Sequence, residues 1–308
     1  MPDRKHALDA HAAAALLVCC FLWGLNQVAV KVALPEIPAL LQAGGRSLVG
    51  ALLVWAWARW RGVALFDRDG TLGAGLFAGA LFAAEFGAIF VGLQFTTASR
   101  MVVFLYLAPF VVALGMPFVA KSERLAPLQA AGLVCAFAGV AWAFAESFSQ
   151  PSVGQRQWWG DALGVAAALL WGATTLAIRS SRLNTASAEK TLLYQLGVTA
   201  VALTGLGLLT GDVWPVSMSV LVAWSFAFQC VIVSFASYLA WFWLVRNYPA
   251  TRLASFTLLT PVFGLLLGAW LLGEPITLRL WIALVAVSAG IVLVNRRAPA
   301  APAGAEAA

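Results

Sequence analysis

Two ionisable residues, Arg46 and Glu85, lie inside otherwise apolar stretches of the sequence. Glu85 is the only acidic residue deep within any such stretch. A guanidinium in this setting attracts an anionic group, and a carboxylate binds a cationic group or a proton. The alternative is a purely structural ion pair between the two side chains. Each interpretation places both residues away from hydrocarbon, because an ionised side chain is poorly tolerated there.

Aromatic rings and small polar groups in the apolar stretches suit the binding of a small molecule. Rings offer stacking surfaces, and a few amide or hydroxyl groups fix the polar ends of a ligand. Together with the two ionisable residues, the candidate binding residues are Trp23, Asn26, Arg46, Glu85, Phe86, Tyr106, Trp171, Thr174, Ser234, Ser237, Tyr238 and Trp241. Plainer explanations exist for some of them. Asn26 can bond a neighbouring helix, Thr174 can bond its own backbone, and the face from Ser234 to Trp241 can be a packing seam.

Two prolines, Pro109 and Pro261, occupy matching places in the apolar stretches 99–120 and 253–272. A proline within a helix removes one backbone hydrogen bond and bends the helix. A single proline of this kind is often only a bend. Two at matching positions predict paired hinges or paired walls of a cavity.

The apolar stretches that carry these residues must be membrane helices. Apolar residues make up 62% of the 308-residue chain and charged residues only 10%, whereas soluble domains contain about 25% charged residues. A helix of roughly 20 apolar residues crosses a bilayer, and it satisfies its own backbone groups there. We therefore predict an all-α integral membrane protein with ten transmembrane helices. They are 12–34, 39–59, 72–93, 99–120, 127–145, 160–178, 189–209, 220–245, 253–272 and 278–295.

The sequence contains one pattern twice. The matching pairs are Thr97–Phe110 with Pro249–Phe263, Trp23-Gly24 with Trp171-Gly172, Lys31 with Arg179, Glu123 with Glu274, and Gly139 with Gly290. We predict two copies of a five-helix unit, at 12–145 and 160–295, followed by a disordered tail at 298–308. Because five is odd, the second copy is inverted in the membrane, which is typical of alternating-access transporters.

Charge predicts the orientation of the chain. Most of the 19 Lys and Arg residues lie in segments that face the cytoplasm if the N-terminus does. This asymmetry places both termini in the cytoplasm, and it accounts for the net charge of +6 without nucleic acid as a partner. The first apolar stretch is too long for a cleaved signal peptide, so we expect it to remain as the first helix.

Motifs of enzymes and of cofactor sites are missing from the sequence. It contains no phosphate-binding loop, no zinc-protease motif and no nucleophile elbow. Its two histidines precede the membrane core, and its four cysteines have no metal-binding spacing. We expect no enzymatic activity, no cofactor and no metal. A polytopic membrane enzyme or a lipid-handling protein is the alternative outside the transporters, and it would need a catalytic cluster.

The doubled pattern resembles the drug/metabolite transporter superfamily, EamA type. The resemblance depends on the Trp23-Gly24 helix with Lys31 at its end, on Thr97–Phe110 and on Glu123, with their partners in the second half. Lys121-Ser122-Glu123 departs from Gly273-Glu274 in one loop. Within the superfamily the chain is most similar to YddG-type bacterial exporters of aromatic amino acids. The resemblance implies a central cavity and two helix bundles that rock between inward-open and outward-open states.

We therefore expect a secondary transporter that exports small metabolites from bacteria across the inner membrane. Amino acids, particularly aromatic ones, are the leading substrates. The expected partners are that small molecule and membrane lipid, and ten helices suffice for a monomer to enclose a cavity. The alternative within the superfamily is a multidrug or cation exporter, with Glu85 as the proton carrier and cation–π contacts to the rings.

Overall fold

The computed structural model describes residues 10–119, 127–149, 151, 153–248, 257 and 259–295. Within these residues the regular structure is entirely helical and contains no strand, so the predicted all-α class is confirmed. The predicted tail at 298–308 lies outside the described residues. The same holds for Glu123 and Arg252 of the repeated pattern.

The helices follow the predicted apolar stretches closely. They are α1 (Ala10–Ala33), α2 (Ala39–Trp60), α3 (Leu72–Gly92), α4 (Ala98–Leu105), α5 (Ala108–Val119), α6 (Pro127–Ser149), α7 (Gln157–Arg179), η1 (Arg182–Thr185), α8 (Ala188–Leu209), α9 (Val220–Ala227), η2 (Phe228–Ser237), α10 (Tyr238–Asn247), α12 (Leu259–Leu272) and α13 (Leu278–Asn295). Within the described residues, 7 helical segments are long and apolar enough to cross a membrane. Shorter apolar helices lie at Ala130–Glu146, Leu259–Leu272 and Leu278–Leu293.

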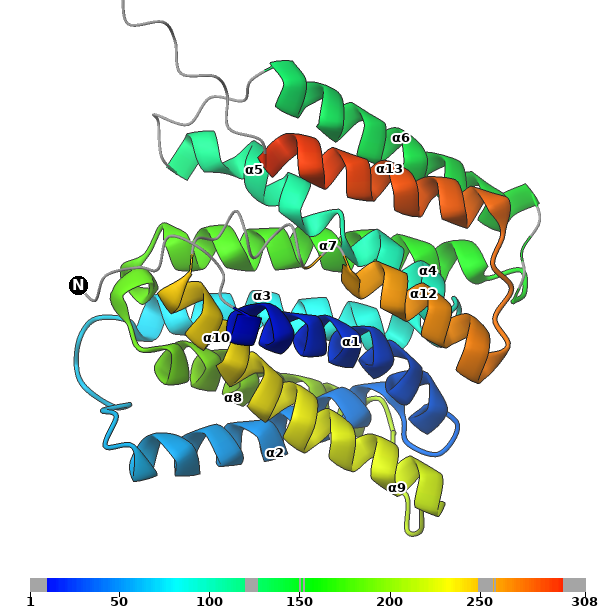
Figure 1. Ribbon diagram of the computed structural model, residues 1–308. Helices are drawn as coiled ribbons and strands as arrows, with labels where there is room; N and C mark the ends of the chain where they lie inside the picture. Colours follow the sequence, from blue (N-terminus) through cyan, green and yellow to red (C-terminus); the bar gives the residue numbers. More distant parts are fainter. Residues whose placement is uncertain are drawn as a thin grey trace, which may run out of the picture.

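The helices run side by side, so their connections gather at two ends of the molecule (Figure 1). One end, on the right in Figure 1, carries the connections 34–38, 93–97, 153–156, 210–219 and 273–277. We call it the Glu274 end. The other carries 61–71 and 180–187, and we call it the Asp69 end. Residues midway along the helices are therefore remote from water at either end.

Two clusters of buried apolar side chains hold the bundle together. The first draws mainly on α1, α2, α3 and α8. The second draws mainly on α4, α5, α6 and α13. Each cluster includes residues from both predicted halves of the chain, such as Phe86 with Ala167 in the first and Val102 with Leu265 in the second. Burial of apolar side chains thus links the two halves rather than separating them.

Glycines let several helices approach closely. A Cβ atom at Gly24 of α1 would lie 2.7 Å from the backbone nitrogen of Gly264 in α12. A Cβ atom at Gly79 of α3 would lie 2.8 Å from the carbonyl oxygen of Tyr194 in α8. Real side chains do not tolerate such distances to backbone atoms. The small residues are therefore required where these helices cross.

The predicted helix 99–120 is broken in the structure. Pro109 has no amide hydrogen to donate to the carbonyl of Leu105, so one helix cannot continue through it. The chain turns tightly, with the Tyr106 amide donating to the carbonyl of Val103 at 3.3 Å. It then resumes as α5, with Pro109 as the second residue. In that first turn no intrahelical donor is needed.

The predicted helix 220–245 also departs from a regular α-helix. Its central ten residues, Phe228–Ser237, form the π-helix η2 between α9 and α10. A π-helix bonds each residue to the fifth one along and is frequent at functional sites. Ser234 and Ser237, which begin the face predicted to run from Ser234 to Trp241, therefore follow one another with π-helical rather than α-helical spacing.

Candidate functional site

Arg46 is the centre of a buried polar cluster that lies nearer the Glu274 end than the Asp69 end, since it is the eighth of the 22 residues of α2. It is 0% exposed. Its Nη1 donates to Oδ1 of Asn26 at 3.4 Å, and its Nη2 donates to the hydroxyl of Tyr238 at 3.2 Å. Its guanidinium carbon lies 4.5 Å from the ring centroid of Phe86 and 5.3 Å from that of Phe90. Helices α1, α2, α3 and α10 thus meet around one cation.

Glu85 of α3 is buried near this cation but is not paired with it. Glu85 is 5% exposed, and its Oε2 has no hydrogen-bond partner among the described residues. The ion pair that the sequence left open is not formed within the described residues. Arg46 Nε and Ser234 Oγ are also buried without a partner there, and the Ser234 Cβ lies against Gly50, one turn from Arg46. Such orphaned atoms are rare in folded proteins and call for a ligand or water.

A pair of glutamines separates Arg46 from the Glu274 end. Gln42, one turn before Arg46 in α2, donates from Nε2 to the carbonyl of Val30 at 3.3 Å and to Oε1 of Gln229 at 3.2 Å. Gln229 of η2 donates in turn to the carbonyl of Ala29 at 3.2 Å. Both glutamines are 0% exposed. This layer fastens α2 and η2 to α1 and closes the cluster on that side.

The predicted residues of α1, η2 and α10 come together beside Arg46. Trp23 donates from Nε1 to Oγ of Ser237 at 3.0 Å. Its ring meets that of Trp241 edge-on, with centroids 5.4 Å apart. Because Tyr238 follows Ser237 directly and bonds Arg46, the rings and the guanidinium form one continuous group.

Tyr106 and Trp171 form a second ring pair, where α4 ends beside α7. Their centroids are 6.1 Å apart and their planes stand at 87°. Thr174 donates to the carbonyl of Leu170 in its own helix at 2.8 Å. The structure thus shows the backbone hydrogen bond that the sequence analysis gave as the alternative to a binding role for Thr174. Within the described part of the chain, Arg46 contacts Asn26, Tyr238, Phe86 and Phe90 rather than these three residues.

The two prolines predicted as hinges both lie in helices. Pro109 is the second residue of α5, and a proline in the first turn of a helix leaves no intrahelical donor missing. Pro261 lies in α12, two residues after Leu259, and residue 258 lies outside the described residues. The role of both prolines as hinges stays a prediction.

The sequence did not single out a fully paired cluster around Arg100, near the Glu274 end. Arg100 donates to Asp161 of α7 from Nε at 3.1 Å and from Nη2 at 2.6 Å. Its Nη1 contacts Glu146 of α6 at 2.9 Å, and its Nη2 donates to the carbonyl of Ala143 at 2.6 Å. Thr277, before α13, also donates to Glu146, at 2.9 Å. The cluster ties α4 to α6, α7 and α13.

Glu274 caps the beginning of α4 from across the molecule. It accepts hydrogen bonds from the amides of Ala98 and Ser99, at 2.7 and 2.9 Å, and from the Ser99 hydroxyl at 2.7 Å. Its Oε1 lies 3.7 Å from Lys31 Nζ, and Lys31 also donates to the carbonyl of Thr96. Carboxylates at a helix N-terminus satisfy free amides and complement the helix dipole. Glu146, Asp161 and Glu274 all lie at ends of apolar stretches on one predicted side of the membrane. That shared position was the signal in the sequence that could have revealed the Arg100 cluster and the Glu274 cap.

A carboxylate also fastens the Asp69 end. Asp69 Oδ2 lies 2.8 Å from Lys190 Nζ of α8, and Oδ1 accepts from the Thr71 hydroxyl at 2.6 Å and from the Thr71 amide at 3.0 Å. The bond from Lys190, and then the bonds from Thr71, hold the pKa of Asp69 below its usual range. This contact joins the connection between α2 and α3 to the start of α8.

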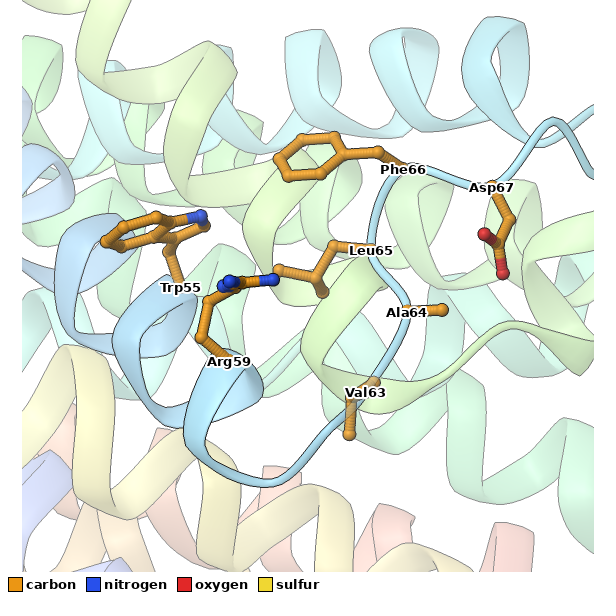
Figure 2. Close-up of a pocket in the computed structure, with 7 residues that line it drawn as sticks. All are labelled: Trp55, Arg59, Val63, Ala64, Leu65, Phe66 and Asp67. Carbon is orange, nitrogen blue, oxygen red and sulfur yellow. The ribbon is translucent and has the colours of Figure 1, made fainter.

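Two hollows of the described residues lie at the ends, away from Arg46. One, of about 430 Å³, lies where α2 ends and is lined by Trp55, Arg59 and Val63–Asp67 (Figure 2). The other, of about 300 Å³, opens beside Pro38 and Asp212. Arg46, Glu85 and Asn26 are at most 6% exposed. The central cluster is therefore closed off from both ends.

Comparison with known proteins gives a consistent family assignment. The profile of the EamA-like transporter family matches residues 11–145 and 158–296. The uncharacterized transporter YvbV of Bacillus subtilis is 28% identical over 98% of this chain and 97% of its own length. A probable amino-acid metabolite efflux pump of Salmonella typhimurium is 31% identical over 85% of this chain and 87% of its own. A solved crystal structure matches with a TM-score of 0.64 at 20% identity, over 92% of this chain and 97% of that one, which supports the fold alone.

The family match spans most of the chain. The relatives are named as a transporter and an efflux pump, and the alignments cover most of their lengths. Apolar helices of membrane length fit the same conclusion. This chain is a multi-pass membrane transporter that belongs to the EamA-like transporter family.

Proposed function

We propose that the protein exports amino acids, aromatic ones among them, by alternating access through the cluster around Arg46. The observation that carries the proposal is a buried guanidinium and a buried carboxylate that do not neutralise each other. Arg46 bonds only neutral groups, and Glu85 Oε2 bonds nothing in the described residues. A buried charge without a partner is strongly destabilising, so both groups are suited to an outside partner.

An amino acid carries the two charges that this cluster lacks. Its carboxylate matches the guanidinium of Arg46, whose Nε is without an acceptor, and planar guanidinium groups bind carboxylates with two parallel bonds. Its ammonium matches Glu85. The amide of Asn26 and the hydroxyl of Tyr238, which now hold Arg46, can release it to the substrate because neutral acceptors bind a cation more weakly than a carboxylate does.

The aromatic side chains around the cluster favour a ring-bearing substrate. Phe86 and Phe90 already cover one face of the guanidinium, and the Trp23–Trp241 pair lies beside Tyr238. Offset or edge-on ring pairs add about 0.5–1.5 kcal/mol beyond the burial of their area. The amino-acid efflux activity that the name of the Salmonella relative states also supports this substrate class.

The proposed transport cycle uses an inverted topology. We assign ten spans, with α4 and α5 forming the fourth and α9, η2 and α10 the eighth, and both termini in the cytoplasm. Two matched ranges of the family profile support two repeats. Arg59, Arg61, Arg68 and Arg182 gather at the Asp69 end, which supports a cytoplasmic location of that end in a bacterial inner membrane. The Glu274 end is then the outer one, and its two carboxylate clusters must open to release substrate.

Transport by purified protein in liposomes tests the substrate class. Labelled phenylalanine should exchange across the membrane, and Arg46→Lys should raise its KM at least tenfold, because an ammonium cannot form the paired bonds of a guanidinium. Glu85→Gln should also raise it, by about tenfold, which corresponds to loss of one charge-assisted bond. Arg279→Lys is the matched control, since Arg279 stacks on Trp142 outside the cluster. Unchanged KM values in both test variants would refute the proposal.

A multidrug or cation exporter is the second candidate, and the unpartnered Glu85 favours it. In that case a quaternary ammonium compound would bind Glu85 and the rings, and would compete with phenylalanine. The fully buried Arg46 opposes a bound cation. We therefore expect free zwitterionic amino acids to compete strongly and quaternary ammonium compounds to compete weakly. The opposite order would favour the cation exporter.

A further inference from the structure

One face of α2 carries a stripe of exposed apolar side chains that ends at an arginine. Leu48, Leu52 and Trp55 are 51%, 57% and 45% exposed. With Arg59 they follow one another at steps of four, three and four residues, which places all four on one helix face. Because α2 is long and apolar enough to cross a membrane, the leucines face acyl chains, and Arg59 lies where hydrocarbon gives way to water.

A hollow lies beside Arg59, where the chain leaves α2. Gly62 turns the chain with a φ of 67°, and the following loop, Val63–Asp67, forms the opposite wall of the space of about 430 Å³. Figure 2 shows the Arg59 side chain projecting between the Trp55 ring and Leu65, with the Phe66 ring on the same side of the loop. Phe66 is 78% exposed. The hollow is thus open toward the surroundings and has one cation and two rings at its rim.

The charge of Arg59 is not balanced by an ion pair with any residue that the structure describes. The neighbouring Arg61 lies over the Trp57 ring at 5.8 Å. Asp67 is the only acid in the lining. Its carboxylate lies at the far end of the loop from Arg59 (Figure 2), and its backbone carbonyl is held by Lys190 at 3.1 Å. An anion from outside is therefore the complementary partner for Arg59.

We propose that this hollow binds the phosphate group of an anionic phospholipid. The guanidinium of Arg59 holds the phosphate, Trp55 and Phe66 flank the glycerol region as aromatic residues do at membrane interfaces, and the acyl chains follow Leu52 and Leu48. The apolar stripe selects a lipid over a soluble phosphate, because a soluble anion gains nothing from it. The lipid would brace the connection between α2 and α3, and this role does not depend on the transported substrate.

Lipid binding to the purified full-length protein in neutral detergent tests the proposal. The probes are phosphatidylglycerol and phosphatidylcholine with identical acyl chains, and bound lipid is counted by native mass spectrometry. The test variant is Arg59→Gln. The matched control is Arg68→Gln, which removes the same charge from the connection that follows α2 but lies outside the hollow. Both arginines are exposed, so both variants should fold.

We expect the wild type and Arg68→Gln to prefer phosphatidylglycerol. Arg59→Gln should bind phosphatidylglycerol about fivefold more weakly, the ratio expected when one basic residue near an anionic headgroup is lost, and should bind phosphatidylcholine as before. Trp55→Ala should weaken both lipids. An equal loss in the two arginine variants would overturn the proposal, because it would mean diffuse attraction to the lipid surface. Competition by millimolar inorganic phosphate would also overturn it, in favour of a soluble-anion site.

Discussion

Replacement of Glu274 is the sharpest test of how the Glu274 end stays closed. The change Glu274→Gln keeps the shape of the side chain but removes its charge. In the protein this carboxylate accepts two backbone amides and one hydroxyl from Ala98 and Ser99, at 2.7 to 2.9 Å, in a site only 9% exposed. We expect the variant to open this end more often, because the cap that joins the α12–α13 connection to α4 is weakened.

The size of the effect follows from these contacts. A glutamine has one acceptor oxygen, so at least one of the three donors loses its bond, and Lys31, 3.7 Å away, loses its counter-charge. A hydrogen bond to a charged group contributes about 1.5–3 kcal/mol. A loss of about 2–3 kcal/mol changes an equilibrium roughly 30- to 140-fold, because each 1.4 kcal/mol is a factor of ten. The open population should therefore rise by at least one order of magnitude.

Thiol labelling from outside measures that population. Ala29→Cys is a suitable reporter, since Ala29 is 7% exposed and its carbonyl accepts from Gln229 in the layer that covers Arg46. A membrane-impermeant maleimide should label this thiol at least tenfold faster in Glu274→Gln than in the parent. Peptide mass spectrometry separates the reporter from the native cysteines, of which Cys135 is exposed.

Glu36→Gln is the control, because Glu36 accepts the Ser219 amide at 2.7 Å at the same end of the molecule but on its surface. Its labelling rate should equal that of the parent. If Glu274→Gln labels no faster than this control while remaining folded, the carboxylate cap does not hold the end closed. The assignment of that end as the outer gate would then lose its support.

Three further predictions concern stability. Arg100→Gln should lower the free energy of unfolding by about 3–5 kcal/mol in detergent, because it leaves two buried carboxylates without their cation. The pKa of Asp69 is depressed, so its contribution is present above the unfolded value of about 3.9 and is lost as the pH falls through the folded value. The difference in unfolding midpoint between wild type and Asp69→Asn should therefore shrink below about pH 4. Gly24→Ala should destabilise the protein, because the new Cβ would lie 2.7 Å from the Gly264 nitrogen. A Cβ at Gly197 would have nothing within 4 Å, so Gly197→Ala should be neutral or stabilise the protein by up to about 1 kcal/mol. Thermal unfolding of both variants measures the difference.

The helices could be predicted from the sequence because hydrocarbon imposes one rule on every segment. A long apolar run must satisfy its backbone internally, so its length and composition nearly determine its form. The break in the helix at Tyr106 was harder to predict from the sequence. Pro109 indicates that one hydrogen bond is lost, but whether a helix bends or ends there depends on its neighbours. The π-helix of residues 228–237 leaves no clear mark in composition, because its extra residue per turn is fixed by packing against α1 and α2.

Some buried charged side chains could be predicted from the sequence and others could not, because packing between helices decides which charges meet. Arg46 and Glu85 were conspicuous because a charge within an apolar run is costly in lipid. Arg100 was equally charged, but its partners Asp161 and Glu146 lie at the ends of two other stretches. Only the packing of α4 against α6 and α7 brings them together. Pairing across helices depends on rotation and depth, and spacing along one helix does not report either.

The contrast between these two arginines is the strongest physical argument for the site. Arg100 has two carboxylates and a backbone carbonyl around it, as expected of a charge buried for structural reasons. Arg46 is buried at least as deeply, yet among the described residues only an amide and a phenol accept its hydrogen bonds, while Oε2 of the nearby Glu85 has no partner there. Membrane helices that served stability alone would replace such a pair with apolar residues at little cost. Its presence beneath a layer of paired glutamines is explained if a zwitterion occupies the cluster during part of the transport cycle.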